Sequence, residues 1–212
     1  MLDAAGPPDD LRESLAGTGL DGARLADAIH FRSLLESANA HMNLVGASTL
    51  ADFWRRHVLD SAQLLGLAPG ARRWADLGAG AGFPGVVLAI LLKGEPDVEI
   101  LLVDSMTKRC GFLDEVVRTL GLPARVINAR AEFLALDVDV VTARACAPLS
   151  RLLGFARPSL KRHAIGLFLK GEEVDRELAE ARKSWRFKLK VHPSLSDPRG
   201  RILEITELAR GR

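Results

Sequence analysis

Apolar side chains repeat at spacings of three and four residues through the first third of the chain, as on one face of a helix. The residues of this face are Ala28, Phe31, Leu35, Ala38 and Met42. A second apolar stretch over residues 50–65 predicts another helix, which the turn-forming Gly66, Pro69 and Gly70 would end. We therefore expect residues 1–70 to form a helical extension.

The pattern changes at residue 72, where short apolar runs begin to alternate with helix-like stretches. The runs that predict strands cover residues 73–77, 99–103, 124–128, 138–142 and 164–169. The stretches that predict helices cover residues 84–92, 105–120, 149–160 and 172–183. Such alternation indicates a parallel sheet wound by crossover helices. Residues 71–212 are therefore expected to form one Rossmann-like domain.

Two further apolar runs, residues 185–191 and 201–206, follow the last predicted helix. The gap between them, residues 193–200, suits a hairpin and is too short for a parallel crossover. We therefore expect an α/β fold with a seven-stranded, mostly parallel sheet and one antiparallel strand near its C-terminal edge. A plain dinucleotide-binding fold would instead have six parallel strands.

Composition places the 212-residue chain among ordinary globular proteins, with 48% hydrophobic and 26% charged residues. The N-terminus lacks the basic start and apolar core of a signal peptide, and the longest apolar run, residues 83–92, is about half a membrane span. The two cysteines, Cys110 and Cys146, suggest neither a disulfide framework nor a metal site. We expect a cytoplasmic, reduced protein with no membrane association and no metal.

The charge distribution is uneven. Residues 1–100 carry 13 acidic and 8 basic side chains, whereas residues 101–212 carry 14 acidic and 21 basic ones, and Arg outnumbers Lys by 22 to 7. Because Arg binds phosphate with two parallel hydrogen bonds and stacks on bases, this bias favours a nucleic-acid partner. A GC-rich coding bias with charges on solvated faces explains the same counts, so charge alone leaves both interpretations open.

A glycine-rich segment follows the first predicted strand. The strand ends at Asp76, and glycines then stand at alternate positions, Gly78, Gly80 and Gly82, before Pro84. Glycine tolerates positive φ and has no side chain, so such a turn lets the backbone approach a small cofactor closely. In an open α/β sheet the turn lies at the carboxyl ends of the strands, where ligands bind.

Asp104 ends the second predicted strand and is the expected partner of that turn. A carboxylate at this position can accept both hydroxyls of a ribose, each charge-assisted bond being worth about 1.5–3 kcal/mol. Ser105 suits the N-cap of the helix that follows. These residues predict a cofactor that contains a nucleoside.

Two cofactors share this arrangement. Residues 80–85 match the G-x-G-x-x-G pattern of NAD enzymes, with Asp104 beyond it at the usual distance. S-adenosylmethionine is favoured by Asp76, which stands where a carboxylate can face the ammonium of a methionine moiety. Gly78, tight against the strand, and Pro84, at a first helical turn, favour it as well. We therefore prefer S-adenosylmethionine to NAD.

Further motifs lie on both sides of the glycine segment. They are Asn43-Leu44, Arg56-His57-Val58-Leu59-Asp60-Ser61, Asp104-Ser105 with Lys108-Arg109, Arg130-Ala131-Glu132, Arg144-Ala145 and Leu169-Lys170-Gly171. With residues 76–85, these motifs resemble the ribosomal RNA small subunit methyltransferase G family, also called glucose-inhibited division protein B, over about residues 25–208. The chain departs from the family at Met42, where many members have Tyr, and at Ala79 and Ala81, where Pro or Ser is frequent.

The resemblance implies the class I S-adenosylmethionine-dependent methyltransferase fold, whose seven-strand order the apolar runs also fit. It implies methylation of guanine N7 in 16S rRNA, in a 30S subunit or an assembly intermediate, by a protein that we expect to be a monomer. Guanine N7 has an in-plane lone pair and no proton, so the transfer needs in-line positioning and no general base.

Two other methyltransferase chemistries find less support. Enzymes that methylate exocyclic amines use an (Asn/Asp)-Pro-Pro-aromatic segment after the fourth strand, and residues 142–148 do not contain one. Cytosine C5 enzymes use a nucleophilic cysteine. Cys146 lies in roughly that region, but we interpret it as a small buried residue, because transfer to N7 needs no thiolate.

The candidate site residues fall into three groups. Candidates for cofactor binding are Asp76, Gly78, Gly80, Phe83, Asp104, Ser105, Ala131, Glu132 and Arg144. Candidates for RNA binding are Arg55, Arg56, His57, Lys108 and Arg109, with Lys161 and Arg162 as further phosphate contacts. Arg144 and Lys170 are candidates for substrate positioning, and no residue is assigned as a catalytic acid or base.

Several of these residues have a second interpretation. Phe83 packs either on the cofactor or at the helix start, and Glu132 meets either the adenine edge or solvent near a helix N-terminus. Arg144 and Lys170 either line the transfer pocket or bind RNA phosphate. We interpret His57 as a helix-surface residue that binds RNA or pairs with Asp60, rather than as a general base.

Two other functions remain as alternatives. One is an S-adenosylmethionine-dependent methyltransferase that acts on another RNA, a protein or a small molecule. The other is a ribosome-binding module that senses the cofactor without transferring a methyl group.

Overall fold

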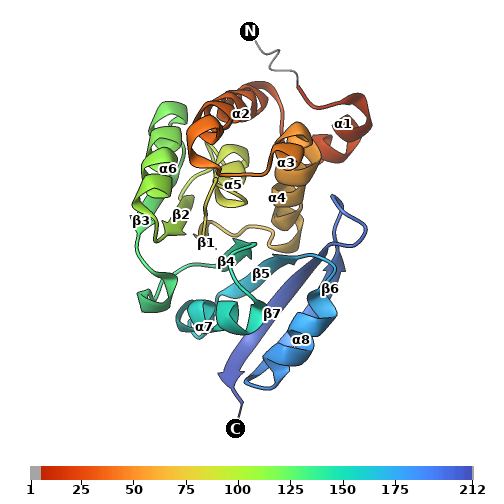
Figure 1. Cartoon of the computed structure of the whole chain (residues 1–212), viewed down its shortest axis with the longest axis vertical. Coiled ribbons are helices and arrows are strands. Elements are labelled where there is room, and N and C mark those ends of the chain that lie inside the picture. The colour runs from red at the N-terminus through yellow and green to blue at the C-terminus, as the bar shows by residue number, and fades with distance from the viewer. Residues whose placement is uncertain (1–5, 212) are drawn as a thin grey trace.

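A seven-stranded sheet runs through the molecule in the order β3-β2-β1-β4-β5-β7-β6 (Figure 1). The computed structural model describes residues 6–211. The strands are β1 Arg73–Leu77, β2 Glu99–Asp104, β3 Ala124–Asn128, β4 Val140–Arg144, β5 Ile165–Lys170, β6 Trp185–Pro193 and β7 Arg201–Arg210. Strands β1 to β5 pair in parallel, and β7 is antiparallel to both β5 and β6. The expected mostly parallel sheet with one antiparallel strand is confirmed.

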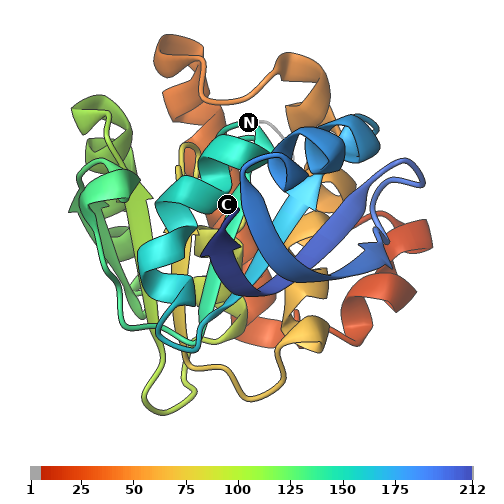
Figure 2. The ribbon, with the colours of Figure 1, turned by 90° about the horizontal axis from the view of Figure 1, so that it is seen from below.

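Helices cover both faces of the sheet. They are α1 Asp9–Ala16, α2 Gly22–Met42, α3 Ala47–Ala51, α4 Asp60–Ala62, α5 Gly85–Leu91, α6 Thr107–Leu120, α7 Leu149–Leu160 and α8 Val174–Arg182. The first six lie towards the N-terminal side in Figure 1, and α7 and α8 lie on the other side. Seen from the end at which the chain finishes, β6 runs beside α8 and β7 runs beside α7 (Figure 2).

Alternation along the strands divides the core into two apolar clusters. Trp74 of β1 and Leu102 of β2 pack into the cluster under α2, α5 and α6. Their neighbours Ala75 and Leu101 point the opposite way, into the cluster under α7 and α8. This arrangement follows from the two-residue period of a strand, which sends successive side chains to opposite faces.

The helical extension shares its core with the sheet. Phe31 of α2 and Leu64 belong to the same apolar cluster as Val86 of α5. We keep the division into residues 1–70 and 71–212 as a proposal about chain organisation; residues 1–5 and 212 of those ranges lie outside the described part. No helix within residues 6–211 is both long and apolar enough to cross a membrane.

The helix expected over residues 50–65 differs from a regular α-helix. After α3, the chain forms a π-helical turn over Trp54–Leu59 (η1), one turn of α-helix in α4, and a 3-10 turn over Gln63–Leu67 (η2). Apolar spacing does not distinguish these helix types, because all of them can bury one side of such a segment. Wide π turns occur frequently at functional sites.

Two local predictions need correction. Strand β4 begins at Val140, two residues later than expected, because the Asp139 carboxylate caps the amides of Arg72 and Arg73, each at 2.8 Å. Ser105 is not the N-cap of α6, which begins at Thr107. The amide before that helix, on Met106, donates instead to Asp104 Oδ1 at 2.8 Å.

Candidate active site

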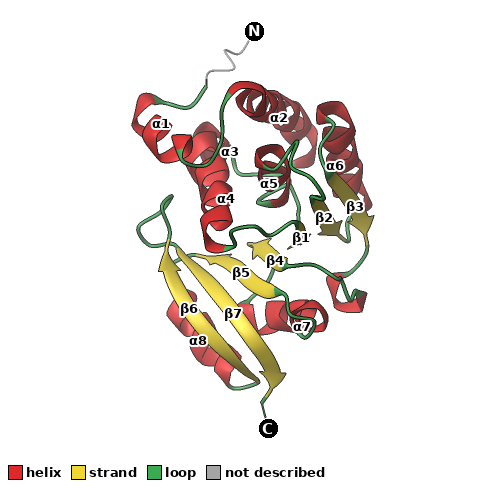
Figure 3. Ribbon diagram, turned by 180° about the vertical axis from the view of Figure 1, so that it is seen from behind, coloured by secondary structure: helices red, strands yellow, loops and turns green. Residues whose placement is uncertain are grey.

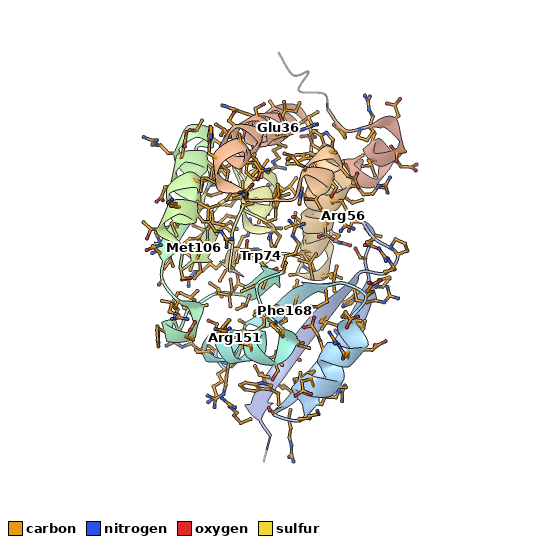
Figure 4. All side chains as sticks on the ribbon, viewed as in Figure 1. Glu36, Arg56, Trp74, Met106, Arg151 and Phe168 are labelled. Atoms are coloured by element: carbon orange, nitrogen blue, oxygen red, sulfur yellow. The ribbon has the colours of Figure 1, made fainter. Side chains whose placement is uncertain are left out.

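A cavity of about 860 Å³ opens at the carboxyl ends of β1, β4 and β5. Its walls come from the glycine loop after β1, the segments after β4 and β5, the helical segment around η1, and the loop between β6 and β7. Of the sequence candidates, those that line it are Arg56, His57, Gly78, Gly80, Phe83, Arg109, Arg144 and Lys170. In Figure 4, Arg56 lies above the strand ends, on the side of the β6–β7 loop.

The glycine loop has a backbone that side chains would disrupt. Gly78 has φ of +72°, and a Cβ there would lie 2.5 Å from Cys146 Sγ. Gly82 has φ of +98°, and its Cβ would lie 2.6 Å from Val86 Cγ2. Both positions need glycine for conformation and for space. The loop therefore packs closely on Cys146 and Val86, and its role as a cofactor cradle remains a prediction.

Asp104 holds this loop in place. Its Oδ2 accepts the Gly80 N–H at 3.0 Å, while Oδ1 accepts the Met106 N–H, and only 5% of the residue is exposed. Arg109 Nη1 lies 3.7 Å from Oδ2. Asp104 thus joins the loop after β1 to the end of β2 from outside the cavity lining, and its bond to a ribose remains a prediction.

Asp76 lies beneath the loop rather than in the cavity lining. It is fully buried, and its Oδ2 accepts the Gly85 N–H at 2.8 Å. Its Oδ1 has no hydrogen-bond partner among residues 6–211. Burial raises the pKa of Asp76 to about 7, against the opposing effects of the Gly85 N–H and Arg144. A contact between Asp76 and a cofactor ammonium remains a prediction.

Arg144 ends β4 and is held at the cavity wall by three acceptors. Nη1 donates to the Arg56 carbonyl at 2.6 Å and to Asp60 Oδ2 at 3.3 Å, and Nη2 donates to His57 Nδ1 at 2.8 Å. The Nε hydrogen and the second Nη2 hydrogen have no partner among the described residues. The guanidinium is therefore fixed in orientation while keeping donors for a ligand.

Phe83 and His57 pack against each other beside this arginine. Their rings stack with centroids 4.2 Å apart, and Arg144 Cζ lies 4.9 Å from the Phe83 centroid. Phe83 is 3% exposed and packs mainly on protein. Cofactor packing on its ring remains a prediction.

The expected helix-surface position of His57 is wrong, because only 3% of the residue is exposed. Burial, with Arg144 and Arg56 nearby, lowers its pKa to about 3. An arginine only donates, so Nδ1 of the neutral ring accepts and the proton is on Nε2. The lone pair that a general base would use is therefore already occupied. The expected pairing with Asp60 is replaced by the bond that each residue makes to Arg144.

The buried neutral His57 predicts a dependence of stability on pH. The pKa is about 3 in the folded state and about 6.5 in the unfolded state, so the unfolded state binds more protons between these values. The resulting stability is complete above pH 6.5 and declines as the pH falls. Asp76 acts in the opposite direction, since its raised pKa favours the folded state at low pH.

A His57→Asn variant separates the effect of His57 on stability from that of Asp76. Urea unfolding at pH 6.5 and pH 5 should show the stability advantage of the wild type over the variant shrinking by about 2 kcal/mol. An advantage that does not change with pH would contradict a buried neutral histidine.

Lys170 ends β5 in a similar environment. Its Nζ donates to the Ala147 carbonyl at 2.9 Å and to Glu177 Oε2 at 2.7 Å, and its side chain is 7% exposed. An ammonium has one further hydrogen for a ligand. Lys170 and Arg144 thus stand on neighbouring strands with donors available at the same cavity.

The other candidates lie outside the cavity lining. Glu132, next to Ala131 in a 3-10 turn (η3, Ala131–Phe133), pairs with Arg130 at 3.1 Å. Arg55 forms an ion pair with Asp10, whereas Lys108 and Ser105 are exposed. The structure contradicts the predicted N-cap role of Ser105. The binding roles of all these residues remain predictions. No cluster of three or more potential metal ligands was found within residues 6–211.

Sequence reasoning missed two parts of the site. Asp60 stands inside a recognised motif, but its bonds to Arg144 and to residues beyond position 190 were not expected. The β6–β7 loop also lines the cavity, through Ser194, Ser196 and Asp197. The expected antiparallel strand could have indicated the position of this loop. A strand that runs opposite to β5 must begin at the edge where β5 ends.

The chain is similar to a known family over most of its length. The family model for rRNA small subunit methyltransferase G (GidB) matches residues 24–201. The ribosomal RNA small subunit methyltransferase G of Caulobacter vibrioides (strain NA1000 / CB15N) is 55% identical over 212 residues, 100% of this chain and 95% of that protein. The protein of the same name from Caulobacter sp. (strain K31) is 60% identical over 191 residues, which cover 90% of this chain and 86% of that protein.

Solved structures show the same fold at low sequence identity. A SAM dependent methyltransferase from Aquifex aeolicus has a TM-score of 0.55 and 19% identity over 74% of this chain and 95% of that one. Cofactor-bound Rv0187 from MTB has a TM-score of 0.59 and 16% identity over 95% of this chain and 98% of that one. These likenesses establish the fold, while the family model and the relatives extend over most of the sequence. The chain belongs to the rRNA small subunit methyltransferase G family.

Proposed function

We propose that this protein transfers a methyl group from S-adenosylmethionine to N7 of a guanine in 16S rRNA. It would act as a cytoplasmic monomer on a 30S subunit or an assembly intermediate. The observation that carries the proposal is the cavity at the strand ends, where a glycine backbone cradle faces Arg144 and Lys170. One wall suits a cofactor, and the other offers positively charged donors to a base and its phosphates.

The residues present fit the cofactor. The glycine loop presents backbone to the cavity, with open space beside Gly80, and the Asp104 carboxylate at the end of β2 is the acceptor expected for ribose hydroxyls. S-adenosylmethionine, when bound, supplies an electrophilic methyl group on a sulfonium. The loop and Asp104 would hold it at the β1–β2 side of the cavity.

The protein's part in the reaction is to position the base. Guanine N7 carries a lone pair in the ring plane and no proton, so a base held in line with the methyl group reacts without proton removal. The free donors of Arg144 and Lys170 would hold the guanine O6 or the adjoining phosphate. The occupied Nδ1 of His57 fits a mechanism without a general base.

One experiment tests the activity. The purified protein is incubated with methyl-labelled S-adenosylmethionine and 30S subunits from a strain that lacks the homologous methyltransferase, and the label is mapped by mass spectrometry. Label at N7 of one 16S guanine is the expected result. Label on another atom, on ribosomal protein or on a metabolite would refute the proposed specificity, and binding without transfer would indicate a non-catalytic module.

A further inference from the structure

The β6–β7 loop, residues 194–200, forms one side of the cavity. It lies towards the β7–β6 edge of the sheet, away from the glycine loop after β1. Because β7 runs antiparallel to β5, the loop that precedes it lies at the carboxyl ends of the parallel strands. Figure 3 shows it extending from the ends of β6 and β7 towards α4. Ser194, Ser196, Asp197 and Gly200 contribute to the cavity lining.

Gln63 anchors this loop to the helical segment. Its Oε1 accepts the Leu195 N–H at 2.8 Å, and its Nε2 lies 3.2 Å from Ser194 Oγ. The same Nε2 donates to the Asp60 carbonyl at 2.9 Å. Gln63 is only 9% exposed, and burial of an amide is costly unless its polar atoms are bonded. The loop is thus held by a buried side chain from outside the sheet.

Asp60 links the loop to the transfer site. One carboxylate oxygen accepts the Ser196 hydroxyl, and the other accepts Arg144 Nη1. Arg56, whose carbonyl also holds Arg144, donates to Asp197 Oδ2 at 2.8 Å. Asp60 and Arg56 therefore each bond both to the loop and to Arg144. The loop thus has a defined position relative to the base that Arg144 would hold.

The outer side of the loop combines an apolar side chain with a basic one. Leu195 is 65% exposed, and the Arg199 side chain is 69% exposed and pairs with Glu172 Oε2 at 2.8 Å. Arg201 lines the neighbouring part of the cavity. An RNA strand with its target base in the cavity must cross the rim, where a phosphate would replace Glu172 as the partner of Arg199 and Leu195 offers an apolar surface to a ribose or a base.

We propose that the β6–β7 loop is an RNA-recognition element, in which Leu195 contacts the nucleotide next to the target and Gln63 is a positioning residue that holds the loop. This inference rests on the proposed rRNA methyltransferase activity. The loop then governs substrate affinity, whereas cofactor affinity depends on the glycine loop and Asp104.

The test compares Leu195→Asp with Val191→Asp. Val191 lies on β6, outside the loop, and is 48% exposed, so the control adds the same charge to the same hairpin. Leu195→Asp is expected to raise the KM for 30S particles at least tenfold, with kcat at saturating particles changed less than about twofold and the Kd for S-adenosylmethionine unchanged. Val191→Asp is expected to leave all three constants near the wild-type values.

Gln63→Leu tests the anchor. We expect it to raise the KM for 30S particles at least fivefold and to accelerate hydrogen exchange at residues 194–200. If this variant does not fold, Leu195→Asp alone decides the assignment.

Three results would overturn the assignment. They are an unchanged KM in Leu195→Asp, an equal rise in Val191→Asp, and a fall in kcat without a change in KM. A wild-type protein that methylates no 30S particle would instead refute the proposed function on which the inference rests.

Discussion

Replacing Arg144 by methionine is expected to lower kcat for methyl transfer to 30S particles at least a hundredfold. Methionine fills a similar volume but removes the donors that would hold the base, and loss of one preorganised donor typically costs a factor of about 100–1000 in rate. Arg144→Lys keeps the charge but loses the planar donor group, so it is expected to recover only part of the rate. Single-turnover kinetics with saturating cofactor and 30S particles measure the effect.

The variant also leaves the Asp60 carboxylate, only 15% exposed, without its cation. An uncompensated buried charge is strongly destabilising. The double variant Arg144→Met with Asp60→Asn removes this charge, and we expect it to recover thermal stability but not methyl transfer. Full recovery of transfer in the double variant would show that Arg144 has only a structural role.

The sheet was predictable because its signals are local. Apolar runs of strand length, the glycine turn after Asp76 and the short gap before β7 each depend on adjacent residues, and these signals predict the seven strands and the single antiparallel one. The side on which the cofactor loop lies follows from the parallel strands alone. The same reasoning, applied to β7, would have placed residues 194–200 at the site.

The parts that were not predictable depend on contacts between distant segments. His57 has a motif position typical of an exposed helix, yet it is buried because the π turn brings it against Phe83 and Arg144. No spacing rule anticipates that contact. Similarly, Ser105 has the chemistry of an N-cap, but Asp104 bonds the Met106 amide and the helix begins later.

Replacing Asp104 by alanine is expected to weaken S-adenosylmethionine binding at least tenfold, as a rise in the Kd measured by calorimetry. One charge-assisted bond to a ribose hydroxyl is worth about 1.5–3 kcal/mol, and about 1.4 kcal/mol corresponds to a tenfold change in affinity. Asp104 also holds the Gly80 amide, so the variant releases the glycine loop as well. Asp114→Ala, which removes the same charge at an exposed position of α6, is expected to leave the Kd unchanged.

A cofactor analogue that lacks the ribose hydroxyls separates the two roles of Asp104. If the carboxylate binds the ribose, the analogue loses affinity for the wild type but loses little more for Asp104→Ala, because the two changes remove the same bonds. If Asp104 acts only by holding the loop, the losses add. Additive losses, or an unchanged Kd in Asp104→Ala, would refute the ribose assignment. Non-additive losses would identify the end of β2 as the point where the protein recognises the nucleoside.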